Sequence, residues 1–325
     1  MLSIQEIKEK GYLPQKTQLK MMIGGGLALS KTLLLNFTDV KKLRVIPKDA
    51  ERYVRPKRPY ELPAYDSTMK TYQSDEQYLR PTLFCNHLEP EVIALAHKLG
   101  AYQKTDEEFA EAAFHFVKEK MTLEILPFNR VGETIQRGTG TCIHLITVFI
   151  ALCRAAGIKA RYKMFAMNMI QAWYDAVVDV DPLIKKWYDS MGYFMIEGEG
   201  EVFIDGEWKV AHVGPRAERQ AAAGIPITKF GEDSLGRWFF AVPGSIMIME
   251  SIPLGLGRAL SLLKKIAPGS MERVNISIQK QIAKGAEIIE KAGGINAYDA
   301  QAREKNEIQK PSLELQHKNE IIFES

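Results

Sequence analysis

Residues 134–163, TIQRGTGTCIHLITVFIALCRAAGIKARYK, decide the fold of this 325-residue chain. The segment 142–156 is apolar nearly all round, which is typical of a helix that is buried on every side. Gly157 follows directly and suits the left-handed residue that ends many helices. Residues 158–165 then have the pattern of a strand. A buried central helix that runs into a strand predicts a mixed α+β core.

Cys142 opens this helix, directly after the Gly-rich turn 137–141. Unsatisfied N–H groups and the helix dipole place about half a positive charge beside the sulfur at such a position. This charge stabilises the thiolate, which is the nucleophilic form, and the same N–H groups can bind a developing oxyanion. Cys142 is therefore a candidate nucleophile. A buried cysteine that serves only as a small apolar side chain is equally compatible with the position.

The other cysteines carry no comparable pattern. Cys153 lies 11 residues further along the helix, about 16 Å away, which is too far for a disulfide with Cys142. Cys85 lies in a loop-like segment and receives no role. An odd number of cysteines argues against a secreted disulfide framework. With no signal peptide and no clean apolar stretch of about 20 residues, we expect a cytoplasmic protein without a membrane span.

Two amphipathic helices are expected upstream, at 89–99 and 106–120, and a hairpin downstream, at 200–213. Asp205-Gly206 is a preferred two-residue hairpin turn, so Ile204 should pair with Glu207. This register places His212 opposite Glu199 and diagonal to Glu197.

These segments together resemble the transglutaminase-like cysteine enzymes. In that family a Gly-rich turn presents the nucleophilic cysteine on a buried helix, and an Arg-Ala-Ala-Gly-Ile-x-Ala-Arg connection, here 154–161, leads into a strand. Residues 88–121 resemble the family's helical lead-in, and EVFIDGEWKVAHV (201–213) resembles its catalytic hairpin. The resemblance covers about residues 80–235. It implies an α+β, papain-like fold in which the helix carrying Cys142 packs on an antiparallel sheet.

The hairpin departs from the family in two positions. The family's histidine normally stands four residues before the glutamate of E-V-x-I-D-G-x-W, where this chain has Glu197. Its aspartate normally stands four residues after the tryptophan, where this chain has His212. We therefore predict Cys142 as nucleophile, His212 as base and Glu197 as the acid that orients it, with Glu199 as the rival acid. The alternative is that this catalytic triad is inactive or has been rearranged.

Two further expectations concern the chemistry of this site. Carboxylates beside His212 would raise its pKa and favour a thiolate–imidazolium pair. Gln136, six residues before Cys142, could donate its amide to an oxyanion, as a glutamine does in papain-like enzymes. Gln136 as an ordinary polar loop residue is the alternative.

The chain divides into three regions by composition. Residues 1–79 form a basic N-terminal extension that contains Gly and Pro, residues 80–235 the transglutaminase-like core, and residues 236–325 a helical C-terminal region with a polar tail. Apolar residues make up 46% and charged residues 26% of the chain, and the net charge is +3. This composition excludes a wholly disordered protein.

The basic run 41–58 has two interpretations. It can be a solvated face, or it can dock an acidic partner such as an acyl-carrier protein, since charge complementarity steers association. The Pro-rich part of the run predicts an irregular arm. No nucleic-acid motif accompanies it, so we expect no nucleic-acid partner.

The sequence thus predicts thiol-dependent acyl transfer through an acyl-enzyme on Cys142. The preferred reaction is amide formation or transamidation from an amide or thioester donor onto an amine, with no cofactor and no metal. One alternative is a peptidase or amidase that uses water. A second is a non-catalytic binding module that kept the fold. A third has Cys142, His212 and a carboxylate holding a metal such as zinc.

Overall fold

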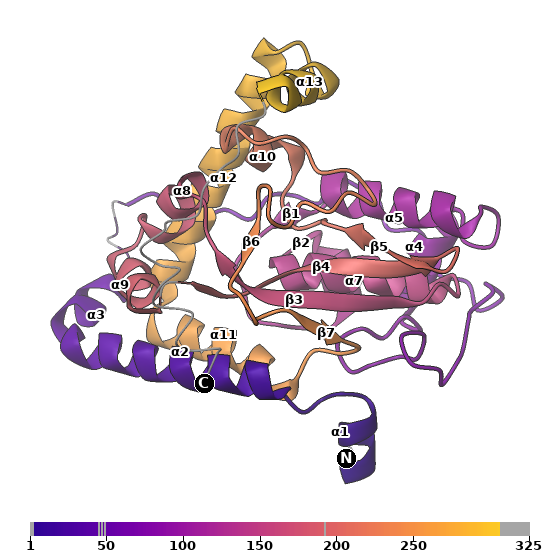
Figure 1. Ribbon diagram of the computed structural model, residues 1–325, viewed down its shortest axis with the longest axis horizontal. Helices are drawn as coiled ribbons and strands as arrows, with labels where there is room; N and C mark the ends of the chain where they lie inside the picture. Colours follow the sequence, from indigo (N-terminus) through magenta and orange to yellow (C-terminus); the bar gives the residue numbers. More distant parts are fainter. Residues whose placement is uncertain (1–2, 45, 47, 49, 192, 306–325) are drawn as a thin grey trace.

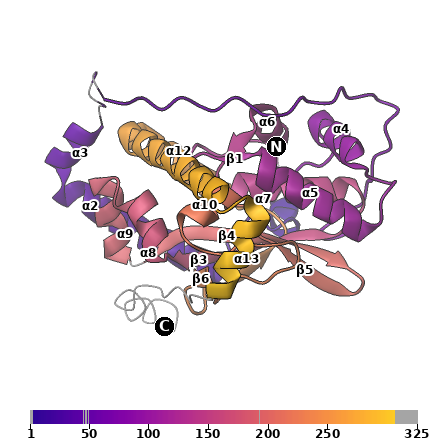
Figure 2. The same ribbon diagram turned by 90° about the horizontal axis from the view of Figure 1, so that it is seen from above.

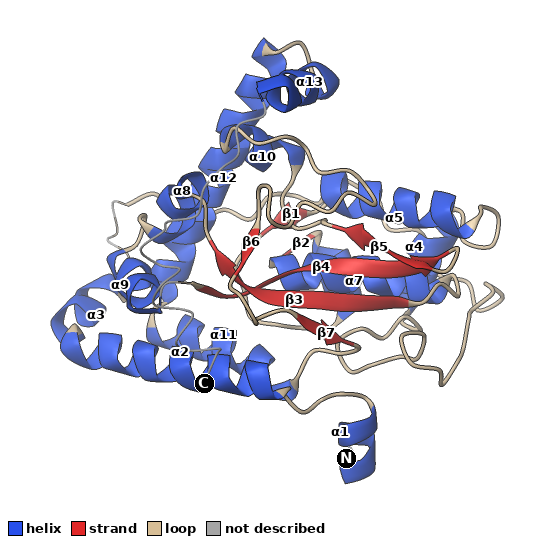
Figure 3. Ribbon diagram, in the orientation of Figure 1, coloured by secondary structure: helices blue, strands red, loops and turns tan. Residues whose placement is uncertain are grey.

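A curled antiparallel sheet lies at the centre of the protein (Figure 1), whose computed structural model describes residues 3–44, 46, 48, 50–191 and 193–305. Helices surround this sheet (Figure 3). The fold is therefore α+β, as the sequence predicts. The strands run in the order β5 (Glu207–Ala211), β4 (Phe194–Ile204), β3 (Ala160–Asn168) and β6 (Phe240–Ala241), and β7 (Met247–Met249) pairs with β3.

Helix α7 (Cys142–Ala155) packs on β3 and β4. Every residue of α7 after Cys142 is buried, as its apolar pattern predicts. Its other side is covered by α4 (Pro90–Leu99), α5 (Asp106–Lys120) and α6 (Val131–Arg137). This arrangement, a helix that begins at a cysteine and packs on an antiparallel sheet, confirms the expected papain-like core.

The predicted hairpin is formed by β4 and β5. Ile204 pairs with Glu207 and Gly200 with Ala211. Glu199, which precedes Gly200, and His212, which follows the end of β5, therefore lie opposite one another. Asp205 and Gly206 have φ angles of 52° and 85°. Positive φ at both central residues defines the turn that matches the twist of the strands.

A short parallel pair brings further residues to the start of α7. Strand β1 (Thr122–Leu123) pairs with β2 (Thr139–Gly140), which precedes Cys142 by one residue. Gly138 ends α6 with a φ of 75°, a conformation that glycine adopts without steric cost. The loop after β1 thereby lies beside the N-terminus of α7.

An insertion between β3 and β4 covers one end of the sheet. It consists of α8 (Gln171–Trp173), the π-helix η1 (Tyr174–Val178) and α9 (Pro182–Met191). Helix α9 in turn packs on the N-terminal helix α2 (Lys16–Leu35).

The helices that follow the hairpin in the sequence pack over the same end of the sheet. Helix α10 (Ala217–Ala222) packs on α12 (Pro268–Lys291), so closely that a Cβ at Gly285 would lie 1.6 Å from the Glu218 carbonyl oxygen. Helices α11 (Leu254–Ile266) and α13 (Ile295–Lys305) complete the C-terminal region. The sequence predicts a helical region from residue 236 onward, but 240–241 form β6 and 247–249 form β7, because both pair with β3. The polar tail beyond 305 lies outside the described residues.

The N-terminal region contains α1 (Ile4–Glu9), α2 and α3 (Phe37–Leu43), followed by an extended segment that runs along the molecule toward α6 (Figure 2). The irregular arm predicted over the basic run therefore begins after α3. Arg52 pairs with Glu272, Arg55 with Glu124, and Arg58 donates to the Gln136 carbonyl oxygen. Three arginines of the run thus contact this chain itself. Docking of an acyl-carrier protein on 41–58 stays a prediction.

In the part of the chain that the structure describes, no helix combines the length and the apolar character needed to span a membrane.

Candidate active site

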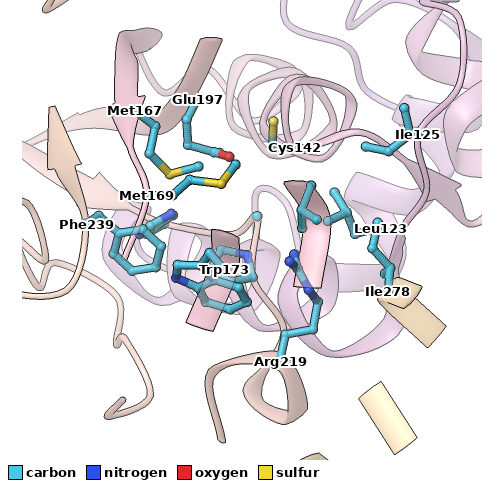
Figure 4. A pocket seen from close by; sticks show the side chains of 14 residues that line it. Leu123, Ile125, Cys142, Met167, Met169, Trp173, Glu197, Arg219, Phe239 and Ile278 are labelled. Carbon is cyan, nitrogen blue, oxygen red and sulfur yellow. The ribbon is translucent and has the colours of Figure 1, made fainter. Parts of the chain in front are cut away.

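One cavity of about 60 Å³ collects the chemically distinctive side chains of the core (Figure 4). It lies where the N-terminus of α7, the end of β4, the residues after β5 and helix α10 meet. Most of its wall is apolar, so a bound group loses its contact with water. The lining residues are Leu123, Ile125, Cys142, Met167, Met169, Trp173, Val177, Glu197, His212, Gly214, Pro215, Arg219, Phe239 and Ile278.

Cys142 is held at the first position of α7 by a capping box. The Thr141 side chain accepts from the His144 N–H, and the His144 ring accepts from the Thr141 N–H. The thiol is half-buried because it faces the cavity. The Ile143 N–H lies against its sulfur and favours the thiolate. Burial outweighs this effect, and the adjacent Glu197 carboxylate adds to burial, so the Cys142 pKa is raised well above its usual value.

Glu197 lies next to the Cys142 thiol. Its carboxylate acts on the sulfur both through its charge and as a hydrogen-bond acceptor. The carboxyl also accepts from the Gly198 N–H at 3.2 Å. Burial raises the Glu197 pKa, because removing a carboxylate from water penalises its charged form. A carboxyl group that is in contact with a protonated thiol is thus available to receive its proton.

His212 is fully buried and lies on the same cavity. Its Nδ1 is 3.0 Å from Ser234 Oγ, and Ser234 Oγ donates to Glu199 Oε1 at 3.4 Å. This chain of contacts assigns the ring proton to Nδ1, with Nδ1 donating to the serine. Nε2 then carries a lone pair, and it has no hydrogen-bond partner among the described residues. His212 thus brings to the cavity wall an imidazole with one nitrogen that is free of hydrogen bonds among the described residues.

The structure corrects the expected pairing of these residues. The carboxylate beside His212 is the rival acid Glu199, whose Oε1 is 3.7 Å from Nδ1, whereas Glu197 lies at the thiol. The expected rise of the His212 pKa is also wrong. Burial lowers this pKa well below its usual value, and the nearby cations of Lys118 and Lys163 lower it further. A preformed thiolate–imidazolium pair is therefore not the resting state.

Gln136 does not reach the cavity. It is an exposed residue in the last turn of α6, and its amide donates to Glu91. The structure places it as the polar surface residue of the alternative interpretation, so the oxyanion role is not retained.

Three residues of the site were missed in the sequence. Ser234 links His212 to Glu199 but stands in a loop with no recognisable motif. Arg219 is described below. Lys118 is buried in α5, and its Nζ lies within hydrogen-bond distance of four acceptors, among which it shares its three protons: the carbonyl oxygens of His212 and Pro215, Gln220 Oε1 and Thr228 Oγ1. The signal for Lys118 is its spacing, since it follows the buried Phe114 by one helical turn.

Glu199 makes the stability of the protein depend on pH. Burial raises its pKa to about 7, although Lys163, with its Nζ 3.2 Å away, opposes this rise. The folded state therefore holds this proton more tightly than the unfolded state does. The stabilisation is complete below pH ~4.5 and is lost as the pH rises to ~7, with a total change of about 3 kcal/mol.

The Glu199→Gln variant cannot titrate at this position, so it should lack this loss. We expect its stability relative to wild type to rise by about 3 kcal/mol between pH ~4.5 and ~7. Urea unfolding at several pH values measures the difference. Glu207→Gln, at an exposed position on β5, is the matched control. Parallel stability curves for wild type and Glu199→Gln would show that Glu199 has an ordinary pKa.

Comparison with known proteins relates part of the chain to a known family. The model of the transglutaminase-like superfamily matches residues 93–187. The matched segment contains Cys142 and ends before Glu197, Glu199 and His212. The match, with a cysteine at the start of a buried helix, supports a thiol-dependent acyl-transfer or hydrolase function in general.

One solved structure resembles part of the chain. It is a protein from Cytophaga hutchinsonii assigned as a cysteine protease, with 19% identity and a TM-score of 0.31. The alignment covers 42% of this chain and 40% of that chain, so this chain spans well under half of the length of the protein that it matches. No curated protein sequence matches the chain.

A metal site of the type considered above needs three ligands close together. Among the residues that the structure describes, no group of three His, Cys, Asp or Glu side chains is placed to hold a metal ion.

Proposed function

We propose that this protein is a thiol-dependent acyltransferase that passes an acyl group from an amide or thioester to an amine. One observation carries the proposal. Cys142, the adjacent Glu197 and His212, whose Nε2 has no hydrogen-bond partner among the described residues, line the same, largely apolar cavity. This arrangement supplies a nucleophile and two separate proton acceptors.

Acylation begins from the neutral thiol. As Cys142 Sγ forms its bond to the donor carbonyl carbon, the thiol proton moves to the adjacent Glu197 carboxylate. The oxyanion of the tetrahedral intermediate forms beside the first N–H groups of α7, where the helix dipole is favourable. The carbonyl–leaving-group bond then breaks, and Glu197 returns the proton to the departing thiolate or amine. The product is an acyl group in thioester linkage to Cys142.

Transfer uses the second proton acceptor. The amine nitrogen bonds to the acyl carbon, and the carbon–sulfur bond breaks. His212 Nε2 takes the proton that the amine loses, while Nδ1 remains held by Ser234 and Glu199. Low basicity of the buried imidazole suits this step, since the proton then passes on to the departing Cys142 thiolate.

The cavity wall favours an amine over water. Its apolar side chains exclude water from the acyl-enzyme, which limits hydrolysis. A peptidase or amidase with water as acceptor is the second candidate, and a binding module without turnover is the third.

The acceptor can be tested with p-nitrophenyl hexanoate as donor and butylamine as acceptor. We expect wild type to form N-butylhexanamide, detected by mass spectrometry, at a rate that rises with amine concentration. His212→Ala should slow this amide formation by about 10²-fold or more and should affect the initial release of p-nitrophenol less. His115→Ala, at an exposed position on α5, is the control and should match wild type.

Two results would contradict the proposal. Release of hexanoate alone, independent of butylamine, would identify a hydrolase. No acylation of Cys142 would favour the binding module.

A further inference from the structure

We propose that Arg219 forms a carboxylate-binding subsite in the cavity, so the acyl donor carries a free carboxylate at the end of an apolar body. This inference rests on the proposed function and specifies its substrate class.

Arg219 is a buried cation that makes few polar contacts with the described residues. Its side chain is 6% exposed. Nε donates to Gln281 Oε1 at 3.1 Å, and the guanidinium lies 4.6 Å from the centre of the Trp173 ring. Within the described residues, no carboxylate pairs with it inside 4.0 Å and its two terminal nitrogens have no hydrogen-bond partner. Burying such a charge is costly unless a partner compensates it.

The fold holds this guanidinium in the same cavity as the reacting groups. Arg219 belongs to α10, which α12 holds in place through the close approach at Gly285. Its side chain reaches into the cavity beside Trp173, on the side away from Cys142 and Glu197 (Figure 4). The charge is near enough to act on both of these residues. An acyl chain that extends from the thiol would therefore meet the guanidinium at its far end.

The chemistry of the cavity selects the anion. A guanidinium presents two parallel N–H groups, which match the two oxygens of a carboxylate. Among the described residues, Arg219 is the only Lys or Arg that lines the cavity, so one negative charge is balanced better than the greater charge of a phosphate. The apolar side chains between the two ends suit a hydrocarbon body.

Two alkylating reagents that differ only in charge test the subsite. 4-(Bromomethyl)benzoate carries a carboxylate at the far end of an apolar ring and 4-(bromomethyl)benzamide is neutral, and both alkylate thiols by the same displacement of bromide. We expect the benzoate-to-benzamide rate ratio at Cys142, followed by peptide mass spectrometry, to exceed that of glutathione by about tenfold. Arg219→Gln should abolish this preference. Arg219→Lys should keep part of it, since the charge remains without the paired N–H groups.

A matched control variant and a second measurement on wild type distinguish loss of the subsite from misfolding of the Arg219 variants. Arg216→Gln removes a neighbouring arginine that pairs with Glu218 and does not line the cavity, and it should keep the wild-type ratio. In wild type, 3-phenylpropionate should protect Cys142 from iodoacetamide at a concentration about tenfold lower than 3-phenylpropionamide does.

The outcomes separate the two proposals. A ratio equal to that of glutathione together with equal protection by acid and amide, while Cys142 still reacts, would overturn the subsite alone. No acylation of Cys142 by p-nitrophenyl hexanoate in the same preparation would contradict the proposed function and, with it, this inference.

Discussion

Replacing Glu197 with glutamine is expected to slow acylation of Cys142 near pH ~7 by about 10²–10⁴-fold, the usual contribution of a positioned proton acceptor. The Cys142 thiol stays protonated because burial and the Glu197 charge raise its pKa. A neutral thiol attacks a carbonyl only if its proton leaves, and the amide of glutamine cannot accept it. The burst of p-nitrophenol from p-nitrophenyl hexanoate measures this step.

Alkylation of the same variant should change in the opposite direction. Loss of the carboxylate removes a contribution that raises the Cys142 pKa, so more thiolate forms at a given pH. We therefore expect faster labelling by iodoacetamide near pH ~9, since only the thiolate is alkylated. Glu201→Gln, on the same strand but away from the cavity, is the control for both assays. Acylation at the wild-type rate in Glu197→Gln would remove Glu197 from the mechanism.

Replacing Lys118 with methionine should lower the free energy of unfolding by about 3–5 kcal/mol, because buried acceptors lose a hydrogen-bond donor. Methionine fills a similar volume but donates no hydrogen bond. Four buried acceptors then lose their contact with this side chain. Gln220 Oε1 keeps the Thr228 N–H, and each group left unsatisfied costs about 1–3 kcal/mol before relaxation. Two of these acceptors are the carbonyl oxygens of His212 and Pro215, so the cavity wall should also loosen.

Urea unfolding measures the loss of stability, and the p-nitrophenol burst reports the cavity in the folded fraction. Lys120→Met, two residues further along α5 and exposed, is the matched control and should change stability by less than about 0.5 kcal/mol. A Lys118→Met variant as stable as this control would show that Lys118 does not hold the loop after β5, which contains His212 and Pro215.

Local patterns in the sequence were sufficient for the core of the fold. The apolar run after Cys142 predicts α7 because only a helix buried on all sides tolerates it. The Asp205-Gly206 turn fixes the register of β4 and β5, and with it the facing positions of Glu199 and His212. The strand β7 was missed because its three residues pair with β3 over a distance of more than 80 residues, which no local periodicity reveals.

The site could be predicted only in part. Its nucleophile and two candidate partners lie in motifs, and the structure brings Cys142, Glu197 and His212 to one cavity. The direction of the pKa shifts could not be predicted, because burial decides them and burial depends on the whole fold. Ser234 and Arg219 come from segments without a motif, and only tertiary packing carries them to the cavity.

The proposed mechanism depends on Cys142 acting as an acyl-accepting nucleophile. Brief treatment with p-nitrophenyl hexanoate, followed by intact mass spectrometry and peptide mapping, shows whether it does. We expect one hexanoyl group per chain, on Cys142, with none on the buried Cys85 or Cys153 and none in the Cys142→Ser variant after the same brief treatment. Hexanoylation of surface lysines alone, identical in wild type and Cys142→Ser, would contradict it.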